Sequence, residues 1–388
     1  MDKAKRLMWI WLKLCLNDNS KKVYEVYKHF NSIEAVISAT NEEYKQLSFL
    51  TEEEIGNLMN KNTYAACEMD LCCQQNHISL ISIECDEYPK EFLELETPPC
   101  LLFTYGNYKL AMSKPKVTIV GTRKCTHYGE NITNKISSAL SMCGCTIVTG
   151  VAEGVDNIAY SATEKTNGSA IVIVPCGFLA SDNTRYKTYS YERSVAISEH
   201  LIDRQQTKYA YHERNRLLSA LSPCTVVTQA PESSGALITA NYALEQGKDL
   251  FAVPANIDLT QSVGSNKLFF DGAAPVLNYK DILEYMIKKY PDKVQTTLTE
   301  EIIETNTDAK FKIETAILNT KKLFFPTLDT MSSNILDLFG ETAVTFDYLL
   351  TKTNYRINEL NSCLTILETA GAIESLPGNR YKLNIKSR

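Results

Sequence analysis

Short β-branched segments alternate with amphipathic helical segments between residues 77 and 285, and this alternation constrains the fold more than any other feature of the sequence. Seven segments have the length and composition of strands: 78–83, 117–120, 146–148, 170–174, 194–197, 225–228 and 250–253. Helical patterns lie between them, such as the apolar stripe of Ile132, Ile136, Leu140 and Cys143. Strands joined by helices at this period predict a parallel sheet covered on both faces, so we expect an α/β domain over 77–285.

The segments that flank this alternation have different patterns. Residues 1–76 contain apolar residues at helical spacing and no strand-like segment, so we expect a helical domain there. The first helical stripe consists of Leu7, Ile10, Trp11 and Leu14. Residues 286–330 are polar and predict a linker. Over 331–388 the sequence predicts three short helices followed by a β-hairpin, which is the layout of a winged helix.

Composition narrows the class of protein. The net charge of the 388 residues is −6, so any contact with nucleic acid has to come from a local basic patch. The twelve cysteines are scattered without a Cys-x-x-Cys pair, and we expect reduced thiols rather than a zinc site or a disulfide framework. The longest near-apolar run, 169–180, is too short to span a bilayer, so we expect a cytosolic protein without a membrane partner.

Loops rich in glycine and hydroxyl groups follow three of the predicted strands. Ligands of a parallel sheet bind beyond the carboxyl ends of the strands, where backbone N–H groups at a helix start attract anions. The loops contain Gly121, Thr122 and Arg123; then Gly150 and Gly154; and then Ser233, Ser234, Gly235 and Thr239. We therefore expect an anion-binding cleft at one edge of the sheet. Ordinary turn chemistry, with Ser and Thr as helix caps, is the alternative.

Familiar nucleotide motifs are missing from these loops. No Walker lysine follows the glycines and no Gly-x-Gly-x-x-Gly occurs, so the NTPase and dinucleotide classes lack their main support. Glu153 and Asp156 precede or begin a predicted helix, where capping is a better interpretation than a catalytic pair.

Basic and aromatic residues alternate in two stretches further along the chain. The first contains Arg185 and Lys187, and the second contains Tyr209, Tyr211, Arg214, Asn215 and Arg216. Cations for phosphates interleaved with rings for bases suit a single strand, although the first stretch also fits a solvated loop. Arg214 and Arg216 begin a predicted helix whose leucines face inward, so we expect both guanidinium groups to be free for an anion. An ion pair with Glu213 or Glu199 is the alternative.

These residues, in this order, resemble the DprA (DNA-processing A) family, also called Smf. The resemblance runs over nearly the whole chain and is carried by an ordered series of short motifs. They are Tyr88-Pro89, Pro98 to Phe103, Val120 to Arg123, Tyr128-Gly129, Gly150 to Asp156, Ser198-Glu199, Arg214 to Arg216, Ser234 to Ala240, Ala252 to Pro254, Gly264 to Asn266 and Gly272-Ala273.

The resemblance implies a fold, a function and partners. The implied fold is a Rossmann-like central domain between an N-terminal helical SAM-like domain and a C-terminal winged helix. The implied protein is a homodimer that binds single-stranded DNA and helps to load a RecA-type recombinase during uptake of foreign DNA. It is not an enzyme, and it needs no cofactor or metal.

Together, the loops and the resemblance predict two sets of contact residues. Residues expected to bind DNA phosphates are Gly121, Thr122, Arg123, Gly150, Gly154, Arg214, Asn215, Arg216, Ser233, Ser234, Gly235 and Thr239. Candidates for contact with bases or backbone are Arg185, Lys187, Tyr209 and Tyr211.

The sequence departs from the family pattern at several positions. Glu153 stands where the family has an arginine, which reverses the charge beside the expected phosphates. Gln229 replaces a glutamate. Asn17, Asp18 and Asn19 replace the glycines of an N-terminal hairpin, so we expect the helical domain not to grip DNA.

Two other functions fit the same sequence. One is a nucleotide-binding sensor or a phosphoribohydrolase-like enzyme on this fold, although Ser233-Ser234-Gly235 stands where such an enzyme usually has Pro-Gly-Gly-x-Gly-Thr. The other is a protein-interaction module with weakened DNA binding, which Glu153 favours.

Overall fold

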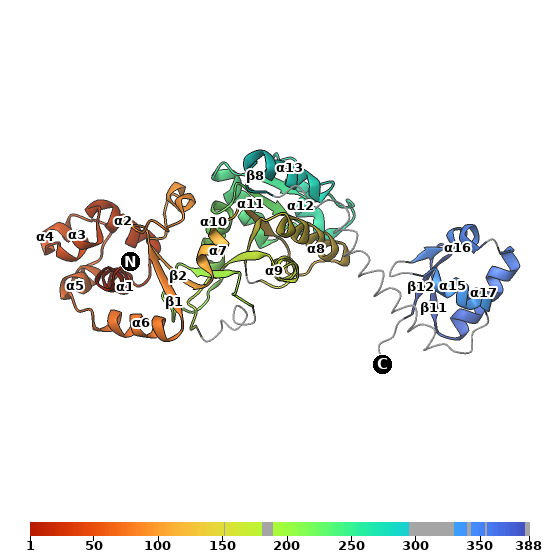
Figure 1. Cartoon of the computed structure of the whole chain (residues 1–388), viewed down its shortest axis with the longest axis horizontal. Helices are drawn as coiled ribbons and strands as arrows, with labels where there is room; N and C mark the ends of the chain where they lie inside the picture. The colour runs from red at the N-terminus through yellow and green to blue at the C-terminus, as the bar shows by residue number, and fades with distance from the viewer. Residues whose placement is uncertain (151, 181–188, 295–329, 340–342, 354, 385–388) are drawn as a thin grey trace. The chain divides into compact units, whose positions relative to one another are not determined.

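The computed structural model describes residues 1–150, 152–180, 189–294, 330–339, 343–353 and 355–384 (Figure 1). Contacts between residues divide the chain into two compact units, 1–298 and 299–388. Most of the predicted linker, residues 295–329, lies outside the described residues. Within the described ranges, no helix is both long enough and apolar enough to cross a membrane.

Helices form the first part of the larger unit, as the sequence predicts. They are α1 (Lys3–Cys15), α2 (Ser20–Phe30), α3 (Ile33–Ser38), α4 (Asn41–Lys45), α5 (Glu52–Asn60) and α6 (Tyr64–Gln75). Side chains that cap helices fix most of their starts; Thr40 and Thr51, for example, each form a capping box. Trp9, Ile10 and Trp11 of α1 are buried in a core that also contains Phe103 and Phe178 from beyond the helices, so the helices and the sheet share one apolar interior.

A nine-stranded sheet with the order β1-β2-β6-β5-β4-β3-β7-β8-β9 forms the rest of the larger unit. Its strands are β1 (Ile78–Ser82), β2 (Leu101–Gly106), β3 (Lys116–Val120), β4 (Thr146–Thr149), β5 (Ser169–Ile173), β6 (Val195–Ser198), β7 (Cys224–Val227), β8 (Asp249–Ala252) and β9 (Ala274–Pro275). All seven predicted strands are present, and β2 and β9 are additional. From β6 to β9 every neighbouring pair is parallel; Ile119 of β3, for example, lies opposite Val226 of β7.

The prediction of an entirely parallel sheet is wrong at one edge, where β1 pairs antiparallel with β2 and β2 pairs antiparallel with β6. The reason lies between β1 and β2. Tyr88-Pro89 and Pro98-Pro99 leave room only for a short 3₁₀ helix, η1 (Lys90–Glu94). The strands of a parallel pair are usually joined by an α-helix that crosses over the sheet, and this connection contains none.

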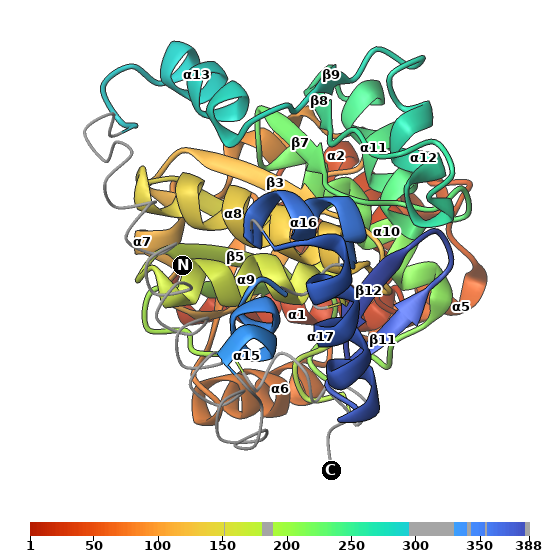
Figure 2. The ribbon, with the colours of Figure 1, turned by 90° about the vertical axis from the view of Figure 1, so that its right-hand side faces the viewer.

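Helices cover both faces of the parallel region (Figure 2). One face buries residues of α8 (His127–Met142), α9 (Val155–Lys165) and α13 (Tyr279–Lys289). The opposite face buries residues of α7 (Tyr108–Met112), α10 (Lys208–Ala220) and α11 (Gly235–Glu245). The remaining elements of this unit are η3 (Thr260–Ser262) and α12 (Val263–Lys267). The arrangement is the predicted doubly wound, Rossmann-like α/β fold.

The strand order reverses beside β3. The chain runs from β3 through β4 and β5 to β6 on one side, and then returns to place β7 on the other side of β3. Two loops therefore diverge at the carboxyl ends of β3 and β7 and leave a crevice, which is where doubly wound sheets bind their ligands.

The smaller unit is a winged helix, as predicted. It consists of α15 (Thr330–Asp337), β10 (Val344–Thr345), α16 (Phe346–Thr353), α17 (Ile357–Thr369), β11 (Ile373–Leu376) and β12 (Arg380–Leu383). The strands form a three-stranded antiparallel sheet of order β10-β12-β11. Leu349, Leu360, Leu364 and Leu367 belong to its own apolar core.

Candidate anion-binding cleft

A cleft of about 630 Å³ opens at the point where the strand order reverses. The loops after β3, β4 and β7 and one side of α10 form its walls. Of the predicted residues, the structure brings together Gly121, Thr122, Arg123, Tyr211, Arg214, Asn215, Ser233, Ser234, Gly235 and Thr239. The structure confirms that these residues lie together, and their role in binding an anion stays a prediction.

Close packing explains two of the glycines. A Cβ at Gly121 would lie 2.6 Å from Val155 Cγ2 and 2.8 Å from the Gln229 carbonyl oxygen. Gly154 has a φ of +75°, and a Cβ there would clash with the Thr122 carbonyl group. The loops after β3 and β4 are further joined by a hydrogen bond from Val155 N to Thr122 O (3.2 Å). These two glycines therefore shape the cleft floor by letting three loops approach one another.

The start of α11 forms another wall. Ser234 is its N-cap, and the Ser234 hydroxyl accepts a hydrogen bond from Ala236 N (3.2 Å). Gly235 has no heavy atom within 4 Å of the position that a Cβ would occupy, so the first turn is open to the cleft. Backbone N–H groups at a helix start carry partial positive charge, and here they are available to an anion.

Two exposed cations follow β3 at the mouth of the cleft. Arg123 and Lys124 are both exposed and both line the cleft. The Arg123 guanidinium lies 5.1 Å from the centre of the Tyr211 ring, and the Arg214 guanidinium lies 5.7 Å from it. Lys124 was not among the predicted residues; its position directly after Arg123 was the available signal. Tyr211 also donates a hydrogen bond to Gln206 Oε1 (2.9 Å), so its ring has a fixed place between two cations.

Arg214 is held from beneath the cleft by buried groups. Only 3% of Arg214 is exposed, and it donates hydrogen bonds to the Ile173 carbonyl oxygen and to Asn215 Oδ1 (3.2 Å). The buried Asp156 carboxylate supplies opposite charge. Burial raises the pKa of Asp156 to about 6, although Arg214 and backbone hydrogen bonds from Ala152 and Gly150 act to lower it. Asp156 was interpreted as a helix cap, and its relation to Arg214 needed the three-dimensional structure.

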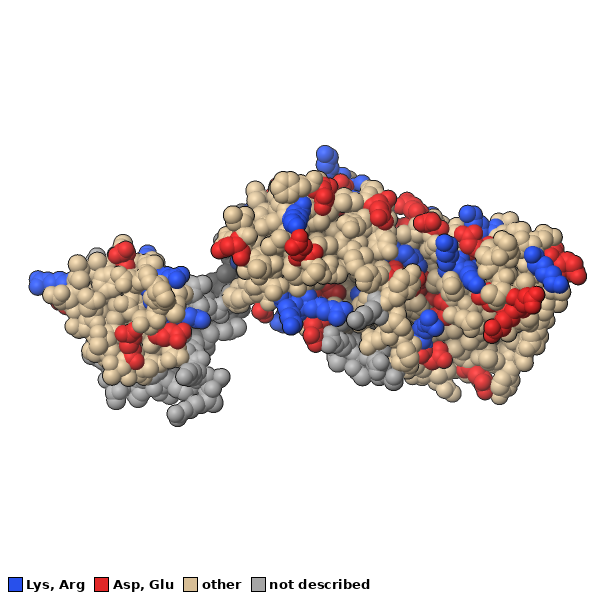
Figure 3. All heavy atoms as spheres, turned by 180° about the vertical axis from the view of Figure 1, so that it is seen from behind, with Lys and Arg blue, Asp and Glu red and all other residues tan. Residues whose placement is uncertain are grey.

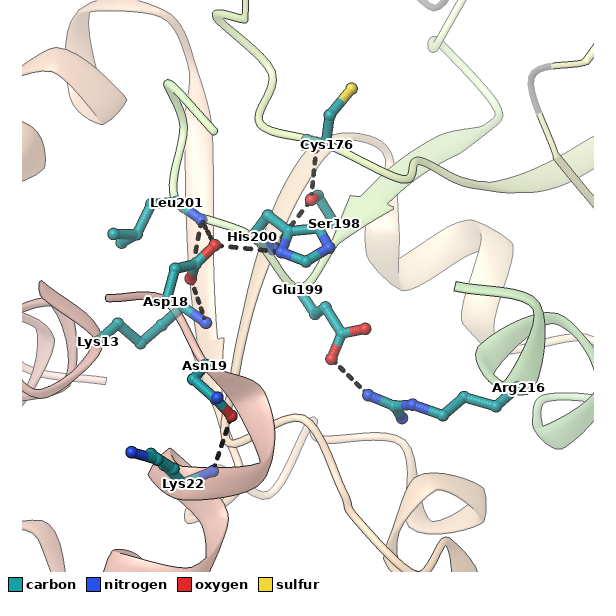
Figure 4. Close-up of polar contacts among 10 residues, drawn as sticks. All are labelled: Lys13, Asp18, Asn19, Lys22, Cys176, Ser198, Glu199, His200, Leu201 and Arg216. Carbon is teal, nitrogen blue, oxygen red and sulfur yellow. Dashed lines mark hydrogen bonds and ion pairs between the residues drawn. The ribbon is translucent and has the colours of Figure 1, made fainter. Parts of the chain in front are cut away.

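Arg216 is paired with protein rather than open to the cleft (Figure 4). Its Nη2 atom lies 2.5 Å from Glu199 Oε2, and the side chains of Arg216 and Glu199 are 14% and 3% exposed. The expectation that both guanidinium groups are free is therefore wrong. Arg214 faces a buried carboxylate, and Arg216 forms the ion pair with Glu199 that the sequence left as an alternative. The guanidinium groups of Arg214 and Arg216 are largely buried, and each therefore needs a nearby carboxylate.

The other predicted residues lie in different settings. Gly150 packs under the cleft, because a Cβ there would clash with the Asp156 carboxylate and the Arg214 guanidinium. Tyr209, on the first turn of α10, is 70% exposed and does not line the cleft. Glu153 is exposed in the loop after β4. Arg185 and Lys187 lie outside the described residues.

The charged residues that line the cleft are mostly basic. Arg123, Lys124 and Arg214 line it, and Asp156 is the one carboxylate among its described lining residues. On the face shown in Figure 3, basic and acidic side chains are interspersed, in keeping with the net charge of −6.

A doubly wound α/β domain with a cleft at its reversal point, followed by a winged helix, defines the class of Rossmann-like proteins with an appended winged helix. Residues 79–287 match the family described as DNA recombination-mediator protein A, and residues 326–379 match the DprA winged helix domain. The chain belongs to this family, whose members are called DprA or Smf.

Individual relatives agree with this assignment. The chain is 33% identical over 214 residues to DNA processing protein DprA of Bacillus subtilis, covering 54% of this chain and 72% of the relative. It is 27% identical over 350 residues to Protein Smf of Synechocystis sp., covering 86% of each. The X-ray structure of DprA from Streptococcus pneumoniae matches with a TM-score of 0.61 and 26% identity, covering 71% of this chain and 95% of that chain.

Proposed function

We propose that this protein binds the backbone of single-stranded DNA in the cleft between the loops after β3 and β7. The observation that carries the proposal is the meeting of two exposed cations, Arg123 and Lys124, with the open first turn of α11 in one cleft. Cations and backbone amides neutralise and orient phosphates without reading the base sequence. The family description, a DNA recombination mediator, supports the same ligand.

A single strand fits the cleft better than duplex DNA does. The cleft is built from loops and a helix start, and it presents no helix or ribbon of the kind that enters a major groove. Exposed Tyr209 on the adjoining turn of α10 offers a ring on which a base can stack. We therefore expect a preference for single strands with little dependence on sequence.

Binding measurements with three ligands test the proposal. A labelled single strand, a blunt duplex of the same length and a nucleoside monophosphate are compared at one salt concentration. The proposal predicts strong binding of the single strand alone. Equal affinity for duplex and single strand contradicts it, and preferential binding of the monophosphate supports the alternative nucleotide-binding function.

The proposed biological role is assistance to a RecA-type recombinase in the cytoplasm during DNA uptake and recombination. The mediator description of the family supports this role.

We further propose that the chain acts as a homodimer. Ile257, Phe270 and Leu277 lie in successive loops around β8 and β9 and are 93%, 94% and 82% exposed, and we propose that a second copy of the chain buries them.

The oligomeric state tests the second part of this proposal. Phe270→Asp places a charge on the proposed contact and is expected to convert dimers into monomers in sedimentation measurements. Leu71→Asp, on the exposed side of α6, is the matched control and should leave the dimer intact. A monomeric unmodified chain, or an intact Phe270→Asp dimer, contradicts the proposed interface.

A further inference from the structure

A second cavity, of about 500 Å³, lies where the helical segment meets the chain that follows β6. Leu14, Asn17 and Asp18, from the end of α1 and the turn after it, form one wall. Leu201, Asp203, Arg204, Gln205 and Thr207, between β6 and α10, form the other. None of these residues lines the cleft described above.

Buried polar contacts hold the two walls together (Figure 4). Asp18 Oδ1 lies 2.7 Å from Lys13 Nζ, and Asp18 Oδ2 lies 3.1 Å from His200 Nδ1. Asp18 also accepts a hydrogen bond from Leu201 N (3.2 Å). The side chains of Lys13, Asp18 and His200 are at most 7% exposed. A cavity whose walls are joined by such a network keeps its shape without a ligand, as binding cavities usually do.

The lining chemistry suits a nucleotide. Leu14 is half-buried and supplies apolar surface that a base can cover. Asn17 and Arg204 are both exposed; the Asn17 amide can hydrogen-bond a base edge, and Arg204 supplies positive charge for a phosphate. Asp203 is the exposed carboxylate of the lining and offsets the charge of Arg204, so the cavity depends on the cleft to hold the strand.

The cavity and the cleft lie at successive turns of the same helix. Thr207, the N-cap of α10, lines the cavity, and Tyr211 lines the cleft. Four residues of an α-helix rise about 6 Å, so the two sites are close together at this end of α10. Thr207 and Tyr211 are four residues apart and therefore lie on the same side of α10, so this side of the helix runs from the cavity to the cleft.

We propose that this cavity is a second subsite for the same single strand, which accepts a nucleotide that has passed along the Thr207–Tyr211 side of α10 from the cleft. Its base packs on Leu14, and its phosphate faces Arg204. The inference rests on the proposed function, and it revises the expectation that the helical domain makes no contact with DNA. Asp18, which was read as a replacement for a DNA-contacting glycine, instead joins the walls of the subsite.

Oligothymidylates of two lengths, about 5 and about 20 nucleotides, test the subsite, because single-strand sites of OB folds span about 4–16 nucleotides. The short strand occupies the cleft first, since the cleft carries more cations. Arg204→Gln should weaken binding of the long strand about threefold, the effect of an exposed ion pair, and reduce its salt slope by about 0.7.

Lys109→Gln is the matched control, because Lys109 is an exposed cation of α7 that lines neither the cavity nor the cleft. It should bind both lengths like the unmodified chain. Unchanged long-strand affinity in Arg204→Gln, or an equal loss for both lengths, overturns the subsite while the cleft remains supported. If the unmodified chain binds neither oligonucleotide, the proposed function fails and the subsite fails with it.

Discussion

Arg216 Nη2 lies 2.5 Å from Glu199 Oε2, and the Glu199 carboxylate is almost completely buried. This pair joins α10 to the segment that follows β6, whose next residue, His200, contacts Asp18. The sequence assigned Arg216 to phosphate binding, but its guanidinium group instead holds α10 against the segment after β6. Arg123 and Lys124, which are exposed, are left as the cations best placed for DNA phosphates.

Removal of Arg216 should affect stability more than binding. Arg216→Ala leaves Glu199 buried without its partner, and breaking such pairs costs about 3 kcal/mol of unfolding free energy. Denaturant titration measures this loss. In the fraction that remains folded, the slope of log affinity against log salt should equal that of the unmodified chain. Unchanged stability together with a shallower salt slope would show instead that Arg216 contacts DNA.

Reversal of the charge at Glu153 should strengthen DNA binding. Glu153 follows β4 and immediately precedes Gly154, which packs against the Thr122 and Arg123 backbone at the cleft. Glu153→Arg replaces repulsion of phosphates by attraction, and about 1 kcal/mol corresponds to roughly fivefold tighter binding at low salt. Glu164→Arg, at the far end of α9, is the control. Unchanged or weaker binding by Glu153→Arg would place this side chain away from the phosphate path.

Asp156 should make stability depend on pH. Burial raises its pKa from 3.8 to about 6, so the folded state binds this proton more tightly than the unfolded state. The resulting stabilisation is fully present below about pH 4 and is lost as the pH rises through about 6, with a total of about 3 kcal/mol. Asp156→Asn lacks this contribution. Unfolding free energies of the two proteins, compared between pH 4 and 7, should therefore diverge; parallel curves contradict the raised pKa.

The winged helix should contribute little to single-strand affinity. The exposed positions of α17 include Glu359 and Glu368, and among the residues described after its N-cap, Arg356, the cations are Arg380 and Lys382. A chain that ends after Val294, a buried residue of the larger unit, should keep nearly all of the single-strand affinity. Loss of most of that affinity, with circular dichroism showing a folded protein, would assign DNA contact to the winged helix and weigh against a protein-binding role.

The sequence predicted strands, helices and loops better than it predicted pairing between distant residues. Periodicity located β3, β4, β5, β7 and β8, because each strand is buried on both faces and is bounded by turns. β2, which pairs antiparallel with β1 and β6, was missed because it directly follows a proline-rich segment. The short β9 offers no periodicity at all.

Within the site, local signals located the loops but not the ion pairs. Glycine and hydroxyl groups after a strand predict a loop near a ligand, and the cleft gathers most of them. The ion pair of Glu199 with Arg216, and the electrostatic attraction between Asp156 and Arg214, depend on side chains from separate parts of the chain. The spacing and composition of the sequence do not predict which carboxylate lies near which arginine.

Salt dependence of binding by Arg123→Ala and Lys124→Ala tests the central claim most directly. Each exposed cation that contacts a phosphate releases counterions when the strand binds, so each removal should make the slope of log affinity against log salt shallower by about 0.7. Melting temperatures should stay near that of the unmodified chain, and Arg216→Ala should keep the original slope. Original slopes in both folded variants would contradict the account, because the strand would then bind outside this cleft.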